Sequence, residues 1–168
     1  CRALSLWSNK MADNSEKIRL ELNDILEYQA NRPPYLMMDC AEEVIPGKSA
    51  KGYKNLTATE WFFSCHFPGD PNMPGMMQIE ALVQMSALAI VTLPGNKGRI
   101  CYLFSANKLL FKRKVLPGDR LYMETEIISF KRGIIRAKGV GTVNGELTCQ
   151  AEYGLVVPEI IEEFRIKR

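Results

Sequence analysis

The stretch from residue 75 to residue 92 is apolar on nearly every side of the helix that it would form. Its apolar residues include Met76, Met77, Ile79, Ala81, Leu82, Val83, Met85, Leu88, Ala89, Ile90 and Val91. A helix without a polar face is a buried helix. At 1.5 Å per residue it is about 27 Å long, roughly the width of a small domain. The rest of the chain therefore has to surround it.

Strand-like patterns supply the surrounding structure. Strands are expected at residues 35–44, 50–57, 99–111, 121–130, 134–143 and 146–157, with an extended aromatic segment at 61–67. Asn144-Gly145 is a signal for a type I′ hairpin turn between the last two strands. An amphipathic helix is expected at 15–28. The class is therefore α+β, a long antiparallel sheet curled around one buried helix at about 75–92.

Chain length and charge limit the remaining possibilities. The 168 residues predict one domain, which we expect at 13–168 after a tail or expression remnant at 1–12. The net charge is only +3, and basic runs interleaved with aromatic residues are absent from the sequence, so nucleic acid is not expected as a partner. The longest uncharged stretch, 81–96, is shorter than the ~20 apolar residues that span a bilayer. No membrane span is expected.

Cysteine usage indicates the compartment. The five cysteines are an odd number and form no CxxC pair, which argues against a disulfide framework and against a cysteine zinc site. We therefore expect a reducing, cytoplasmic environment. The absence of acidic residues from 1–12 leaves an organelle as the alternative.

A single histidine, His66, restricts the chemistry. Imidazole is the side chain that exchanges protons most readily near neutral pH, so a reaction that needs such a base must use His66 or a residue of another chain. A metal site with two histidines from one chain is excluded. Without context, a lone histidine beside an apolar run is more often a satisfied core residue than a catalyst.

The link from His66 to the buried helix is stiff. Pro68, Pro71 and Pro74 each fix a φ angle near −65°. Pro74 suits the first helical turn, and Gly75 lets a ligand approach the backbone closely. The amides of Gly75 and Met76 would then direct free N–H groups at a bound oxyanion, which is the outline of an acyl-carbonyl site.

Glu80 is a carboxylate inside the apolar helix. We expect burial to raise its pKa by more than the nearby helix N-terminus lowers it. The alternative is a glutamate at the open end of the helix, paired with a lysine. Gln84, four residues later, either orients Glu80 through a hydrogen bond or caps a strand carbonyl. His66 and Glu80 together make a candidate pair of an unlike base and acid.

The segment HFPGDPNMPGMMQIEALVQ, residues 66–84, resembles the signature of the β-hydroxyacyl-acyl-carrier-protein dehydratases of fatty-acid synthesis. NRPPYLMMD and FSANKLLFKRKVLPGDRL resemble flanking motifs of the same family, and the resemblance covers about residues 25–157. It implies the hot-dog fold. A glutamate at position 80 resembles the broad-chain-length branch of the family. The branch that also isomerises has an aspartate at this position.

The resemblance also implies the reaction, which is dehydration of a (3R)-3-hydroxyacyl thioester on acyl carrier protein to the trans-2-enoyl thioester. His66 would take the C2 proton, protonated Glu80 would donate to the departing hydroxyl, and the Gly75 amide would polarise the thioester carbonyl. No metal or redox cofactor is implied. Similar proteins are homodimers, some assembled into hexamers, with the histidine and the carboxylate of each site from different chains. Tyr102 matches a gating tyrosine, with core packing as the alternative.

Residues 108–138 hold nine basic and three acidic residues. One interpretation is a solvated face of strands and turns. The other is a basic rim that attracts the acidic carrier protein and that includes Lys112, Arg113, Lys114, Arg120, Lys131 and Arg132. Two other functions stay open beside the dehydratase, a hot-dog acyl-thioesterase and a non-catalytic acyl-binding subunit.

Overall fold

The computed structural model describes residues 17–166, so the predicted tail at 1–12 lies outside the described residues. The elements in chain order are β1 (Ile18–Glu21), α1 (Leu22–Tyr28), β2 (Cys40–Ile45), β3 (Ser49–Asn55), the 3-10 helix η2 (Trp61–Ser64), α2 (Gly75–Val91), β4 (Tyr102–Phe111), β5 (Arg120–Lys131), β6 (Ile134–Val143), β7 (Glu146–Val156) and α3 (Pro158–Ile166).

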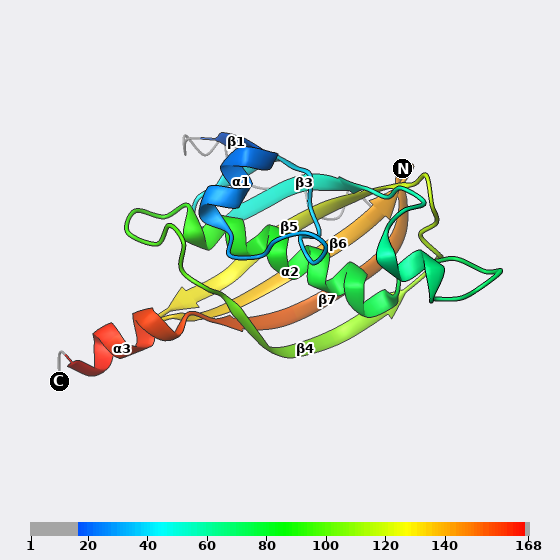
Figure 1. Ribbon diagram of the computed structural model, residues 1–168. Coiled ribbons are helices and arrows are strands. Elements are labelled where there is room, and N and C mark those ends of the chain that lie inside the picture. Colours follow the sequence, from blue (N-terminus) through cyan, green and yellow to red (C-terminus); the bar gives the residue numbers. More distant parts are fainter. Residues whose placement is uncertain (1–16, 167–168) are drawn as a thin grey trace.

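One antiparallel sheet organises the chain. Its strand order is β1-β2-β3-β5-β6-β7-β4, so β1 and β4 are the two edge strands. Helix α2 lies along the sheet and packs against β2, β3, β5, β6 and β7 (Figure 1). This confirms the predicted long antiparallel sheet around one buried helix, which ends at Val91 rather than at residue 92.

Burial of α2 follows from its composition, and polar contacts fix its position. Every residue from Gln78 to Val91 except Glu80 is buried. The hydroxyl of Tyr153 on β7 donates to the carbonyl of Leu82 over 3.0 Å. On β3, a Cβ at Gly52 would lie 2.1 Å from a backbone oxygen of β2 and 2.8 Å from the Met85 side chain. Glycine at this position therefore allows the helix to lie close to the sheet.

Four segments differ from the sequence-based expectation. The strand expected at 35–44 begins only at Cys40, as β2. The helix expected at 15–28 is confirmed only from Leu22, because residues 18–21 form edge strand β1 beside β2. The segment 61–67, expected to be extended, contains a 3-10 helix instead. Phe62 and Phe63 are both buried there, with ring centroids 4.7 Å apart, whereas a strand would turn them to opposite faces. Helix α3 was not expected, and it extends away from the sheet after β7 (Figure 1).

None of the helices in residues 17–166 combines the length and the apolar character that crossing a bilayer requires.

Candidate active site

His66 follows η2 and is held on both sides by backbone hydrogen bonds. Its amide donates to the carbonyl of Phe62 over 2.8 Å, and its carbonyl accepts from the amide of Asn72 over 3.0 Å. The ring nitrogen Nδ1 lies 3.1 Å from the carbonyl oxygen of Asn72. Because a carbonyl can only accept, Nδ1 is the donor, and in the neutral ring Nε2 then keeps the free lone pair. The half-buried ring thus presents Nε2 as a base.

The loop from His66 leads directly into the N-terminus of α2. The amide of Met73 donates to Val115 over 2.8 Å, which ties the loop to the segment before β5. The carbonyl of Pro74 accepts from the amides of Met77 and Gln78. From Met77 onward, the amides of α2 are therefore satisfied by carbonyls of the preceding turn. The amides of Gly75 and Met76 come before these and have no hydrogen-bond partner in the described chain. They are free for an oxyanion.

Phe111, at the end of β4, closes one side of this helix N-terminus. A Cβ added at Gly75 would lie 2.8 Å from the Phe111 ring, which is tighter than real contacts allow. The absence of a side chain at Gly75 therefore lets the ring and the free amides lie next to each other. The ring itself is 45% exposed, so it lines the surface next to the amides.

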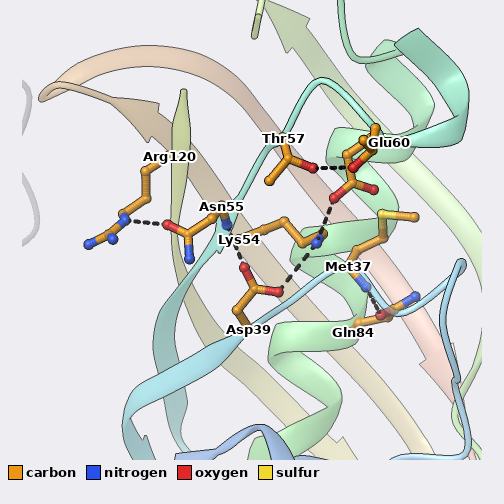
Figure 2. Close-up of polar contacts among 9 residues, drawn as sticks. Met37, Asp39, Lys54, Asn55, Thr57, Glu60, Gln84 and Arg120 are labelled. Atoms are coloured by element: carbon orange, nitrogen blue, oxygen red, sulfur yellow. Dashed lines mark hydrogen bonds and ion pairs between the residues drawn. The ribbon is translucent and has the colours of Figure 1, made fainter. Parts of the chain in front are cut away.

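Glu80 lies one and a half turns into α2 and is half-buried. Its Oε1 accepts a hydrogen bond of 2.8 Å from Nε2 of Gln84. Burial raises the pKa of the Glu80 carboxyl, and the hydrogen bond from Gln84 opposes that rise in part. Gln84 also donates to the carbonyl of Tyr35. Its oxygen accepts from the amide of Met37 (Figure 2). It therefore orients Glu80 and caps neighbouring backbone at the same time, and no lysine contacts Glu80 within residues 17–166.

Glu80 opens into a cavity of about 300 Å³ between the loop after α1, helix α2 and the start of β4. Tyr102 lines the same cavity and is 52% exposed, which excludes packing in the core of this chain. His66 does not contribute to the cavity wall in the described part of the chain. The two candidate catalytic residues therefore do not share this cavity within one copy of the chain.

The six basic residues of the predicted rim lie in two groups. Arg120 and Lys131 are the first and last residues of β5, which at about 3.3 Å per residue places them about 36 Å apart. Lys114 forms an ion pair with Asp70 in the His66 loop, so the stretch Lys112 to Lys114 lies beside that loop. Lys131 and Arg132 belong to the distant β5–β6 turn. The predicted single rim is therefore two separate basic groups.

Local interactions already occupy part of the nearer basic group. Arg113 pairs with Glu146 over 2.8 Å and approaches Asp119 at 3.8 Å. The guanidinium of Arg120 lies 4.3 Å from the centre of the Tyr53 ring and donates to Asn55 over 2.7 Å. Lys112 is exposed, and its ammonium has no partner in the described residues. It is the residue of this group with its charge most available to a partner.

One polar cluster near the site was missed by the sequence reasoning. Lys54 lies between Asp39 and Glu60 (Figure 2), with ion-pair distances of 3.3 Å and 2.9 Å. The sequence did hold a signal for this cluster, because the side chains of a strand point alternately to its two faces. Ala50, Gly52 and Lys54 therefore face the same side of β3, and this parity places a lysine next to buried positions.

A family model described as FabA-like domain matches residues 30–152. The chain belongs to the FabA-like family. Two relatives, both named 3-hydroxyacyl-[acyl-carrier-protein] dehydratase FabZ, support this assignment. The protein of Clostridium novyi (strain NT) is 45% identical over 138 residues, which cover 82% of this chain and 97% of the relative. That of Bacillus subtilis (strain 168) is 44% identical over 140 residues, covering 83% and 99%.

Solved structures confirm the hot-dog fold. The dehydratase heterocomplex ApeI:P from Xenorhabdus doucetiae aligns with a TM-score of 0.69 at 11% identity, covering 86% of this chain and 97% of that one. A hypothetical thioesterase with coenzyme A from Streptococcus pneumoniae TIGR4 aligns with a TM-score of 0.52 at 14% identity, covering 67% and 80%. Since dehydratases and thioesterases share the fold, the fold does not choose between them. The sequence similarity to the FabA-like family favours the dehydratases.

Proposed function

We propose that this chain dehydrates 3-hydroxyacyl-acyl carrier protein to trans-2-enoyl-acyl carrier protein. The observation that carries the proposal is the presence of a candidate base and a candidate acid, each held by hydrogen bonds. The contact of His66 Nδ1 with the carbonyl of Asn72 leaves Nε2 as the ring nitrogen that can accept a proton, and burial raises the pKa of the Glu80 carboxyl, which Gln84 holds in place. The relatives named as FabZ dehydratases support the same reaction.

In the proposed mechanism, Nε2 of His66 removes the proton from C2 of the substrate. The electron pair of that C–H bond forms the C2–C3 double bond, the C3–O bond breaks, and the Glu80 carboxyl gives its proton to the departing oxygen, which leaves as water. The amides of Gly75 and Met76 donate to the thioester oxygen as negative charge develops on it. Elimination of water transfers no electrons to or from the protein, so the steps need neither a metal nor a redox cofactor.

The proposed active form is a homodimer. Edge strand β4 carries four exposed apolar side chains, and an exposed apolar edge is the kind that pairs with another chain. The four are Leu103, Phe104, Leu109 and Phe111. In antiparallel pairing with β4 of a second copy, the start of one strand lies opposite the end of the other. Tyr102, in the Glu80 cavity, would then lie near Phe111 and the His66 loop of the second copy. This supports a site completed by two chains, with hexamers as a further assembly.

We place the reaction in the cytoplasm, with an organelle as the alternative. The free thiols Cys40, Cys65, Cys101 and Cys149 are consistent with a reducing environment. The partner is an acidic acyl carrier protein, attracted by the basic group beside the His66 loop.

Two products measured together test this function. The protein is incubated with 3-hydroxybutyryl and 3-hydroxydecanoyl thioesters, and enoyl formation is followed by ultraviolet absorbance alongside release of free thiol. Enoyl without thiol is expected, and His66→Ala and Glu80→Gln each lower its rate by about 100-fold or more. Thiol without enoyl supports the thioesterase, and neither product supports an acyl-binding subunit. Either result contradicts the proposal.

A further inference from the structure

We infer that Lys54 is a positioning residue for His66, because its ammonium joins Asp39 to Glu60 and so fixes the start of the segment that carries the histidine. The catalytic part of this inference rests on the proposed function. The structural part does not, since it concerns only where the His66 ring lies. Figure 2 shows the lysine between the two carboxylates.

The burial of Lys54 is the first observation. Its side chain is 11% exposed and that of Glu60 is 14% exposed. Lysine and glutamate are rarely buried to this extent without a partner, because removing a charge from water carries a large desolvation cost. The Lys54 ammonium meets this cost with two carboxylates, at 2.9 Å from Glu60 and 3.3 Å from Asp39. The three charges are therefore fixed relative to one another.

Asp39 anchors this cluster to the sheet. Its Oδ2 accepts from the amide of Asn55 over 2.7 Å, and its own amide donates to the carbonyl of Tyr53 over 2.9 Å. Asp39 is thus held by both backbone and side-chain contacts at the end of β3. Because Lys54 lies on the same strand, the ammonium has a fixed origin from which to hold Glu60.

Glu60 passes this restraint to His66 through one short helix. It directly precedes η2, and its carbonyl accepts from the amide of Phe63 over 3.0 Å. The carbonyl of Phe62, whose ring is fully buried, then accepts from the amide of His66 over 2.8 Å. A displacement of Glu60 therefore moves η2 and the His66 backbone together. Asn72 fixes the tautomer of the ring, and Lys54 fixes where the ring lies.

The same short segment also meets the network of the second candidate catalytic residue. Residues 35–39 bond at one end to Gln84, which holds Glu80, and at the other end to Lys54 through Asp39 (Figure 2). The two halves of the site thus have separate supports on one backbone segment. Loss of Lys54 is expected to disturb His66, whereas loss of Gln84 is expected to disturb Glu80.

The single histidine of the chain makes the test direct, because the NMR signals of one imidazole ring report on His66 alone. Lys54→Met is compared with Lys54→Arg, which keeps the charge. The matched control is Lys51→Met on the same strand, where the lysine makes only an exposed ion pair of 3.6 Å with Glu124. Each variant is measured for ring signals, for kcat and KM with a small 3-hydroxyacyl thioester, and for its melting temperature.

Lys54→Met is expected to shift the His66 ring signals and to lower kcat by about 10-fold to 100-fold, since small misplacements of a catalytic group have effects of that size. KM changes by less than about threefold, because uniform substrate binding is retained. Lys54→Arg recovers part of both effects, and Lys51→Met matches the unmodified protein.

Glu60→Gln decides the matter if Lys54→Met does not fold, since glutamine removes the carboxylate charge that pairs with the Lys54 ammonium at nearly unchanged side-chain size. A folded Lys54→Met or Glu60→Gln variant with unchanged His66 signals and unchanged kcat overturns the inference. If the unmodified protein forms no enoyl product but the ring signals still shift, the proposed function fails while the positioning role stands.

Discussion

The side-chain amide of Gln84 donates one hydrogen bond to the carboxyl of Glu80, one helical turn earlier, over 2.8 Å. Its other hydrogen goes to the carbonyl of Tyr35, and its oxygen accepts from the amide of Met37. One buried side chain thus orients the candidate acid and satisfies two backbone groups of the segment before β2.

Gln84→Leu is therefore expected to weaken both stability and turnover. It leaves the buried amide of Met37 without a partner, at about 1–3 kcal/mol, removes one hydrogen bond from the part-buried carbonyl of Tyr35, and frees the Glu80 carboxyl to rotate. Urea unfolding and enoyl formation measure the two effects. The matched control is Gln78→Leu on the same helix, where the amide makes one long bond of 3.4 Å and Oε1 has no partner in the described residues. Equal destabilisation by both variants would contradict the assigned role of Gln84.

Stability should depend on pH through Glu80. Burial raises the pKa of this carboxyl above its ordinary value of 4.5 in the folded state. The folded protein therefore binds the proton more tightly than the unfolded chain does, and the stabilisation present below pH 4.5 is lost as the pH rises through the higher folded-state pKa. The glutamine of Glu80→Gln is uncharged at every pH, so this variant does not lose stability through residue 80 as the pH rises.

Urea unfolding of both proteins at several pH values between 4 and 8 measures this difference. The free energy of unfolding of the unmodified protein should fall relative to that of Glu80→Gln as the pH rises. A constant difference across the range would mean that the carboxyl titrates alike in the folded and unfolded states.

The sequence predicted those parts of the fold that one local pattern determines. Helix α2 was predictable because twelve apolar residues leave it no polar face. The start of the first helix was not, because Ile18 fits both a helical stripe with Leu22 and a strand alternation with Leu20, and pairing with β2 decides for the strand. Helix α3 has only 9 residues, and it is fixed by contacts such as the approach of Ile161 to Gly133 in the β5–β6 turn.

The residues of the site divide in the same way, into those that one stretch of sequence reveals and those that only the fold brings together. His66, Gly75 and Glu80 lie within one short stretch of sequence, so their chemistry could be recognised together. Lys54 acts through Asp39 and Glu60, which belong to other segments, and only the folded chain brings the three together. The division of the basic residues into two groups likewise depends on the length of β5, which separates positions that look close in the sequence.

Gly75→Ala is expected to disturb the helix N-terminus through Phe111. The added methyl would lie 2.8 Å from the ring, and such overpacking typically costs about 1–3 kcal/mol. Either the ring or the amides that face the substrate must move, so enoyl formation should fall by about 10-fold or more. Adding Phe111→Leu, which removes the ring atoms in conflict, should recover part of both losses. A double variant no better than Gly75→Ala would show that the contact is not the cause.

Mixing two inactive variants tests whether one site uses two chains. In a dimer completed across its interface, a heterodimer of His66→Ala and Glu80→Gln has one site with both groups intact and one site with neither. Random exchange of subunits makes half of the dimers mixed, so about a quarter of the unmodified activity should return. The control mixes His66→Ala with the double variant carrying both substitutions, which rebuilds no intact site. Recovery limited to the level of this control would place both groups of each site in one chain.

Carrier-protein docking should depend on Lys112 but not on Lys131. Lys112 lies in the group beside the His66 loop, whereas Lys131 lies about 36 Å from Arg120 at the other end of β5. Lys112→Glu should raise KM for a carrier-linked substrate about fivefold, because it replaces attraction to an acidic partner by repulsion. Raising the salt concentration should reduce this difference, because it screens exposed charges. KM for a small thioester should stay unchanged in both variants, and an equal effect of Lys131→Glu on the carrier-linked KM would place the docking surface elsewhere.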